Sequence, residues 1–282
     1  MAQVSRSVVY DWLRHDKKFP HVWCPGCGLG ILLGSLVRAF VKSGLTKDQV
    51  VLVSGIGCSG RLPVYVDVGS VHTTHGRALT FATGIKLAKP ELTVVTVMGD
   101  GDAMAIGGNH LIHAARRNLG IAAIIVNNQT YGMTGGQYSP TTPLGAKSAT
   151  ALFGQIEPTF DVSGLCASAG ASFVARSTVF HVDQMDRMLG QAIAKAGFSV
   201  VEILSPCYTN FGRQNRLGSQ IEMMKEYRRL GVTVDRWQKM NDSERAGRFP
   251  LGVLVDKDLP TFLDSYRGVC DTAARLRGEG RI

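Results

Sequence analysis

The chain has 282 residues, of which 45% are hydrophobic and 19% charged, a balance typical of a globular protein with a full core. Its N-terminal stretch has no continuous apolar run, and no window reaches the roughly 18 uninterrupted apolar residues of a membrane span, so we expect a cytoplasmic protein without a membrane partner. The net charge of +9 is spread along the sequence without a nucleic-acid-binding motif, which favours an acidic protein partner over nucleic acid.

Residues 1–22 are predicted to form a lead-in that carries no chemistry. The sequence WCPGCG follows at residues 23–28 and contains a C-x-x-C pair, Cys24 and Cys27. The next segment has helical spacing, and no strand signal precedes the pair. This order differs from that of a thioredoxin, in which a strand comes first.

Two further cysteines follow apolar runs that are predicted to be buried strands. Cys58 comes after the run Val50 to Val53, and Cys207 comes after the run Phe198 to Leu204. Together with the C-x-x-C pair they could bring four thiolates together, as ligands of a tetrahedral zinc ion or of an iron–sulfur cluster. One tight pair joined by two distant cysteines favours the cluster. The other two cysteines are predicted to be inert free thiols: Cys166 and Cys270.

A predicted helix that ends before Pro90 is preceded by two histidines, His72 and His75. Histidine serves as a packing or capping residue as readily as a site residue. The residues alone therefore leave the role of both histidines open.

The stretch from Gly99 to Asn128 is predicted to be a βαβ unit. An apolar run ends at Met98 before the sequence GDG, a helix begins near Gly107, and a second apolar run, Ile121 to Val126, ends at two asparagines. The carboxyl ends of parallel strands meet at one edge of a sheet, so a carboxylate and an amide oxygen converge there. Such oxygens suit Mg²⁺, and the glycines let phosphates approach, which predicts a metal-bridged diphosphate.

The alternation of strands and helices continues to the run that precedes Cys207. We therefore predict one α/β domain over residues 23–210, with a doubly wound and mostly parallel sheet. The glycine-rich segment that begins at Gln129 must pass the predicted metal. Residues 211–282 are predicted to be a C-terminal extension packed on the domain or on a partner subunit.

The GDG sequence with a later NN pair resembles the motif of thiamine diphosphate enzymes. In that motif the metal is held by the first aspartate, the second asparagine and a backbone carbonyl two residues later. The resemblance therefore implies Mg²⁺ ligands at Asp100, Asn128 and Thr130.

The sequences CPGCG, GIGCSG and a late S-P-C resemble the β subunit of 2-oxoacid:ferredoxin oxidoreductases, in which four cysteines hold one [4Fe–4S] cluster near the thiamine ring. The implied cluster ligands are Cys24, Cys27, Cys58 and Cys207. Some relatives carry a basic residue where this chain has Gly135, a difference that bears on which acid fits. The implied thiamine diphosphate contacts are Ile56, Gly57, Cys58, Ser59, His75, Gly101, Asp102, Gly132 and Met133.

The resemblance implies coenzyme A-dependent oxidative decarboxylation of a 2-oxoacid, or the reverse carboxylation, with electrons passed to ferredoxin. The sequence GMTGGQ looks most like the 2-oxoglutarate enzymes, but pyruvate and broad-range relatives share nearly every motif. His75 is an implied catalytic residue. Arg61 is a candidate for pairing with the substrate carboxylate, or is a surface or cluster-tuning charge.

Thiamine enzymes also need a glutamate that activates the cofactor, and none of the seven glutamates lies in a second βαβ module that could supply it. We therefore predict that a separate α subunit contributes that glutamate, in an α2β2 assembly. Two alternatives remain: a non-redox thiamine diphosphate decarboxylase or synthase with structural zinc, and a non-enzymatic, zinc-stabilised binding module in which GDG and NN are only turns.

Overall fold

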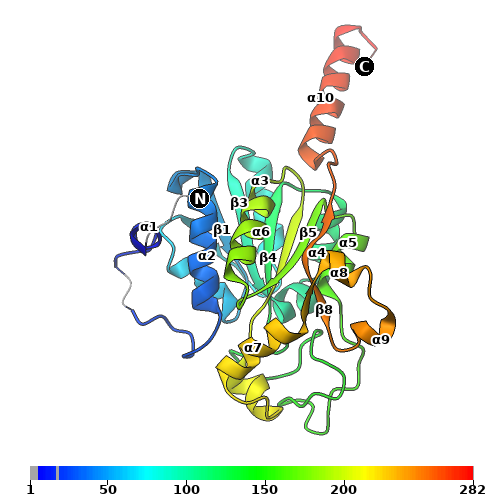
Figure 1. The fold of residues 1–282 in the computed structure, drawn as a ribbon. Coiled ribbons are helices and arrows are strands. Elements are labelled where there is room, and N and C mark those ends of the chain that lie inside the picture. The colour runs from blue at the N-terminus through cyan, green and yellow to red at the C-terminus, as the bar shows by residue number, and fades with distance from the viewer. Residues whose placement is uncertain (1–5, 17–18, 282) are drawn as a thin grey trace.

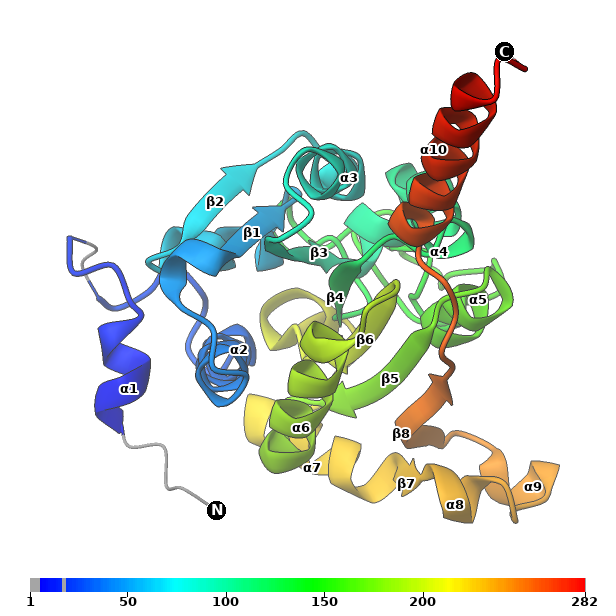
Figure 2. The ribbon, with the colours of Figure 1, turned by 90° about the horizontal axis from the view of Figure 1, so that it is seen from above.

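The computed structural model describes residues 6–16 and 19–281, so part of the predicted lead-in lies outside the described residues. Eight strands form one sheet (Figure 1), in the order β2-β1-β3-β4-β6-β5-β8-β7 that Figure 2 labels. All neighbouring pairs are parallel except β5 and β8, which are antiparallel. The predicted doubly wound, mostly parallel sheet is thus confirmed. The strands are β1 (Val50–Ser54), β2 (Gly69–His72), β3 (Thr93–Gly99), β4 (Ile121–Asn127), β5 (Phe173–Thr178), β6 (Ser199–Leu204), β7 (Gly231–Thr233) and β8 (Phe249–Asp256).

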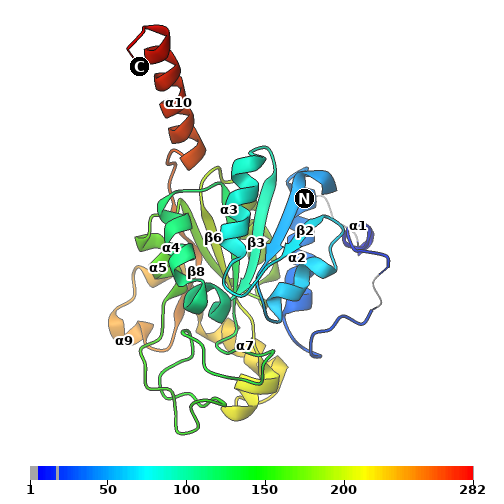
Figure 3. The ribbon, with the colours of Figure 1, turned by 180° about the vertical axis from the view of Figure 1, so that it is seen from behind.

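Helices cover both faces of the sheet (Figures 2 and 3). Helices α2 and α6 pack together over one face, and α3, α4 and α5 lie over the other. The α-helices are α1 (Arg6–Asp11), α2 (Leu29–Lys42), α3 (Ala78–Ala88), α4 (Gly108–Arg116), α5 (Val162–Ser168), α6 (Val182–Ala194), α7 (Gln220–Leu230), α8 (Val234–Trp237), α9 (Asp242–Arg245) and α10 (Phe262–Gly278). Shorter helical turns are η1 (Lys47–Gln49), η2 (Ser59–Val64), η3 (Asp102–Ile106) and η4 (Tyr208–Gly212).

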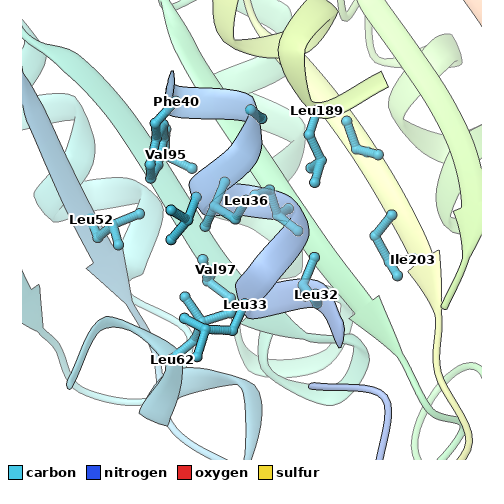
Figure 4. Close-up of a cluster of buried hydrophobic side chains, with 14 of the residues drawn as sticks. Leu32, Leu33, Leu36, Phe40, Leu52, Leu62, Val95, Val97, Leu189 and Ile203 are labelled. Carbon is cyan, nitrogen blue, oxygen red and sulfur yellow. The ribbon is translucent and has the colours of Figure 1, made fainter. Parts of the chain in front are cut away.

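Helix α2 shows why the sequence folds this way. Its leucines and Phe40 recur every three or four residues, which places Leu32, Leu36 and Phe40 on one stripe. All three side chains are fully buried against the sheet, beside Val95 of β3 and Ile203 of β6 (Figure 4). Burial of each side chain contributes about 2 kcal/mol to folding before entropy is counted. The packing fixes the C-x-x-C segment, which immediately precedes α2.

The sheet, with helices on both faces, positions the loops that carry the candidate site residues. Strand β4 is buried along its whole length, as expected for a central parallel strand with helices on both faces. The loops that follow β1, β3, β4 and β6 all leave the same edge, which we call the carboxyl edge. Two of these loops contain π-helical turns, η3 and η4, that the sequence did not predict. Such turns are often found at functional sites.

Residues 211–282 contribute β7, β8 and α10. Strand β8 pairs directly with β5, so part of this segment is built into the sheet. Helix α10 projects away from the body and has no buried residue (Figure 1). The boundary between residues 210 and 211 stays a prediction. Across residues 6–16 and 19–281, no helix combines the length and apolar character needed to cross a membrane.

Candidate active site

A cavity of about 120 Å³ opens at the carboxyl edge, between the loops that follow β1, β3 and β4. It is lined by the three residues predicted to bind the metal and by all nine residues predicted to contact thiamine diphosphate. The structure brings these residues together, and their individual roles stay predictions. The cavity is lined by Ile56, Gly57, Cys58, Ser59, His75, Gly99, Asp100, Gly101, Asp102, Asn128, Thr130, Tyr131, Gly132, Met133 and Thr134.

Asp100 is 1% exposed, and burial raises the pKa of its carboxyl group. Its Oδ2 atom accepts hydrogen bonds of 2.5 Å from the hydroxyl groups of Ser139 and Thr141, which oppose that rise. Within the described ranges no Lys, Arg or His side chain forms an ion pair with this carboxylate. A buried carboxylate that is met only by neutral donors fits a site that a cation completes.

A tight turn after β4 presents the other two predicted metal ligands. Gln129 adopts a left-handed conformation with φ of 62°. The Asn128 amide oxygen accepts a hydrogen bond of 3.3 Å from the Thr130 backbone N–H, and the Thr130 hydroxyl donates to Gln137. Both residues thereby line the same cavity as Asp100. An amide and a backbone carbonyl are oxygen donors of the kind that Mg²⁺ accepts.

Asp102 holds His75 at the cavity wall. One carboxylate oxygen, Oδ1, contacts His75 Nδ1 and accepts a hydrogen bond of 2.7 Å from Gly76 N–H. The His75 ring lies edge-on to Tyr131, with ring centroids 6.0 Å apart. His72, in contrast, pairs with the Ser54 hydroxyl at 3.0 Å and does not line the cavity.

Gly55 is required for this arrangement, because a Cβ atom there would lie 1.8 Å from Asp102 Oδ2. We expect Gly55→Ala to displace Asp102 and to destabilise the protein by about 2 kcal/mol, the usual cost of overpacking. Thermal unfolding measures the change. A Cβ at Gly84 within α3 meets no atom within 4 Å, so Gly84→Ala should instead stabilise the protein by about 0.5–1 kcal/mol. Equal melting temperatures for the two variants would contradict this prediction.

A second cavity lies beside the first and is lined by all four predicted cluster ligands, Cys24, Cys27, Cys58 and Cys207. Cys58 lines both cavities. The Sγ atoms of Cys207 and Cys58 would lie 3.3 and 3.9 Å from a Cβ at Gly132, so a larger residue would press on this space. Among the described residues, no group of three or more His, Cys, Asp or Glu side chains is arranged to hold a metal ion.

Burial, with a smaller effect of the neighbouring cysteines, raises the pKa of Cys27 to about 11. The thiolate is the reactive form, and at pH 8 only about one Cys27 side chain in a thousand should be a thiolate at any moment, so alkylation should be slow. In the chain without a cluster, we expect alkylation of Cys27 to accelerate about tenfold per pH unit between pH 7 and 10. Mass spectrometry after iodoacetamide labelling measures this rate. A rate that is flat over this range would contradict the raised pKa.

The structure separates Arg61 from the cofactor cavity. Arg61 is exposed on η2 and lines neither cavity, although its charge lowers the pKa of Cys58 slightly against the larger effect of burial. Its role toward a substrate carboxylate stays a prediction. None of the seven glutamates, all of which are described, lines either cavity. The sequence reasoning missed Ser139, Thr141 and Tyr131, because no motif marks a hydroxyl or a ring in a long loop.

A cavity suited to a diphosphate cofactor at the carboxyl edge of a doubly wound sheet is typical of thiamine diphosphate-binding proteins. The comparison with known families agrees with this class. Residues 44–203 match the thiamine pyrophosphate enzyme C-terminal binding domain. The chain is 46% identical to the 2-oxoglutarate synthase subunit KorB of Methanothermobacter marburgensis, over 95% of this chain and 94% of that protein. It is 51% identical to the Archaeoglobus fulgidus subunit of the same name, over 81% and 85% of the two chains.

Among solved structures, the chain resembles the 2-oxoglutarate:ferredoxin oxidoreductase from Magnetococcus marinus with 2-oxoglutarate, coenzyme A and succinyl-CoA bound. The TM-score is 0.84 at 31% identity, over 94% of this chain and 90% of that chain. This chain therefore belongs to the β-subunit family of 2-oxoacid:ferredoxin oxidoreductases, on its 2-oxoglutarate branch. The predicted family is confirmed, and its members are subunits of enzymes, which excludes the interpretation as a binding module.

Proposed function

We propose that this chain forms the thiamine diphosphate site and the cluster site of an enzyme that oxidises 2-oxoglutarate. The products are succinyl-CoA and carbon dioxide, and two electrons leave one at a time through a [4Fe–4S] cluster to ferredoxin. The observation that carries the proposal is the pair of adjoining cavities, one with the GDG residues and Asn128 and one with four cysteines, which share Cys58. The names of the relatives and the ligands of the similar structure support the substrate.

In this proposal Asp100, Asn128 and the carbonyl of Thr130 would hold Mg²⁺, which would offset the charge of the bound diphosphate. When bound, thiamine diphosphate supplies the electron sink that lets a 2-oxoacid lose carbon dioxide. The residues of the chain bind the cofactor and orient it. His75 is fixed through Nδ1, which leaves Nε2 for a hydrogen bond to a bound group. The glycines of GDG allow the diphosphate to approach the backbone.

The geometry of the cysteines supports a cluster over zinc. Sulfur ligands of a tetrahedral zinc ion are about 2.3 Å from the metal and therefore about 3.8 Å from one another. Cys24, Cys27, Cys58 and Cys207 line one cavity, and among the described residues they do not form a group suited to a single ion. A four-iron cluster spreads the same four ligands over a larger volume, and the space beside Gly132 is consistent with it.

The test uses the assembly of this chain with its partner subunit, purified without oxygen. We expect a brown protein that contains iron, sulfide and thiamine diphosphate, and that reduces a low-potential dye when 2-oxoglutarate and coenzyme A are added. A panel of 2-oxoacids distinguishes 2-oxoglutarate from pyruvate and from broad specificity. A colourless protein with stoichiometric zinc would refute electron transfer and favour a non-redox decarboxylase or synthase. The chain alone should not oxidise 2-oxoglutarate, because its cavity lacks the activating glutamate.

We also propose that a rigid apolar loop contributes to the contact with the α subunit. Residues 143–160 expose five large apolar side chains, and Phe153 is 101% exposed. The loop is nevertheless ordered by backbone bonds between Gly145 and Gln155 and between Gln155 and Ala146. The residues that immediately precede the loop, Ser139 and Thr141, carry the hydroxyls that donate hydrogen bonds to Asp100. Exposed apolar patches of this kind are typical of protein interfaces. The five side chains are Leu144, Leu152, Phe153, Ile156 and Phe160.

We expect Phe153→Asp to weaken subunit assembly by about 2 kcal/mol or more, the loss typical of a central aromatic residue in an interface. Sedimentation of the co-expressed subunits measures the assembled fraction. Phe81→Asp is the control, since Phe81 on α3 is 49% exposed and lies outside this loop. An assembled fraction that is unchanged by Phe153→Asp would remove this loop from the contact.

A further inference from the structure

Glu202 is a buried carboxylate on β6 that lines neither cavity. It is 2% exposed, and each of its neighbours donates a hydrogen bond to it. Its Oε1 atom accepts from Asn127 Nδ2 at 2.8 Å, and its Oε2 atom accepts from Arg176 Nε and Ser163 Oγ, each at 2.7 Å. Burial of a charge is costly unless it is paired and hydrogen-bonded. This carboxylate is therefore held in one orientation by three donors from three different elements.

The strand register explains the convergence. Glu202 lies directly opposite Arg176 on β5 and Ile125 on β4. Asn127 is two residues beyond Ile125, so its side chain leaves the same face of the sheet. Ser163 reaches this face from α5. A second carboxylate, that of Asp161, pairs with Nη2 of the Arg176 guanidinium.

The Asn127 amide connects Glu202 to the cofactor cavity. Because its NH₂ group donates to Glu202, its Oδ1 atom faces the Gln129 backbone N–H and accepts from it at 3.2 Å. Gln129 is the left-handed residue of the turn, a conformation that is uncommon outside glycine. That turn determines where Asn128 and Thr130 lie in the cavity.

We propose that Glu202 is a positioning residue for the diphosphate and metal site, acting through the amide of Asn127. This inference rests on the proposed function, because it names what orders the turn that would bind Mg²⁺. A carboxylate is needed because it only accepts. A glutamine amide has a single acceptor oxygen, and the charged Arg176 guanidinium competes for it more strongly than the neutral Asn127 amide, which leaves the new NH₂ group against the NH₂ group of Asn127. If Asn127 turned over to relieve that clash, its NH₂ group would then face the Gln129 N–H.

The test is calorimetric titration of Mg²⁺ at saturating thiamine diphosphate, with the assembly of this chain and its partner subunit freed of cofactor by EDTA under anaerobic conditions. We expect Glu202→Gln to weaken Mg²⁺ binding about 10- to 100-fold, as loss of an outer-sphere partner typically does. Asn127→Ala should cause a similar loss while Glu202 keeps its bonds to Arg176 and Ser163. Adding Glu202→Gln to Asn127→Ala should then cause little further loss.

The double variant Asn127→Asp with Glu202→Gln reverses the donor and the acceptor and keeps the net charge. Its new carboxylate can accept from both the new amide and Gln129 N–H, so we expect it to restore most of the affinity. Ser163→Ala is the matched control, because it removes a bond to Glu202 on the side away from Asn127. It should lower the melting temperature and leave Mg²⁺ affinity within about twofold of the wild type.

These outcomes separate the inference from the proposed function. If the wild-type assembly binds no Mg²⁺ with thiamine diphosphate, the proposed function fails. If the wild type binds and Glu202→Gln binds equally well, positioning by Glu202 is wrong. An equal loss of affinity in Glu202→Gln and Ser163→Ala without rescue by the double variant would show general destabilisation and would also overturn the inference. If Glu202→Gln does not fold, the comparison of Asn127→Ala with Ser163→Ala decides.

Discussion

Replacing Cys207 by serine is expected to remove the cluster and to lower dye reduction with 2-oxoglutarate by more than about 100-fold, because the reaction has no other electron acceptor in the site. Cys207 follows β6, and its Sγ atom lies in the space beside Gly132 where Cys58 also points. Serine keeps the size of the side chain and removes the soft thiolate ligand. Iron and sulfide content, visible absorbance and bound thiamine diphosphate should be measured on the same sample.

The matched control for this variant is Cys270→Ser. Cys270 is exposed on α10 and lines neither cavity. The Cys270→Ser variant should keep full iron content and full activity. We expect Cys207→Ser to retain thiamine diphosphate, since Cys207 is not in the cofactor cavity. Full cluster content in Cys207→Ser would show that the cluster is bound elsewhere, and an equal loss in Cys270→Ser would show that the loss is not specific to Cys207.

The second large effect is expected for Asp100→Asn, which should weaken Mg²⁺ binding by at least about 100-fold, or roughly 3 kcal/mol, the scale of losing one partner of a buried charge pair. Asp100 is the buried carboxylate of the cofactor cavity, and the neutral hydroxyls of Ser139 and Thr141 donate hydrogen bonds to it there. The amide of asparagine keeps the shape and removes the charge. Calorimetric titration of Mg²⁺ at saturating thiamine diphosphate measures the affinity.

Asp186→Asn is the control for Asp100→Asn. Asp186 is 5% exposed on α6 and pairs with Arg38 at 2.7 Å, away from the cofactor cavity. Its loss should lower stability without changing Mg²⁺ affinity, because it removes the buried carboxylate that pairs with the partly buried Arg38. Retention of wild-type Mg²⁺ affinity in Asp100→Asn would remove this residue from the metal site.

The sequence was sufficient to predict which loops form the site. Asp100 and Asn128 each follow an apolar run, and so do Cys58 and Cys207. Since parallel strands end at one edge, the positions of these residues directly after predicted parallel strands were enough to place them together, and the two cavities contain them. The position of the C-x-x-C pair could not be predicted from strand ends alone, because it depends on the packing of α2 against the sheet.

The residues around the ligands could not be predicted in the same way. Ser139 and Thr141 lie 39 and 41 residues from Asp100 in a loop without periodicity, and the register between β4, β6 and β5 is needed to bring Asn127 to Glu202. Arg61 follows Cys58 closely in sequence, yet η2 turns it to the surface.

The sequence by itself therefore determined the fold class, the family and the edge of the sheet that carries the chemistry, because strand periodicity and motif spacing are local properties. Only the tertiary structure decided which neutral donors meet Asp100, that Asp102 contacts His75, and that a buried glutamate accepts a hydrogen bond from Asn127. Those contacts join residues far apart in the chain. Their geometry depends on sheet register and helix packing, which no local pattern records.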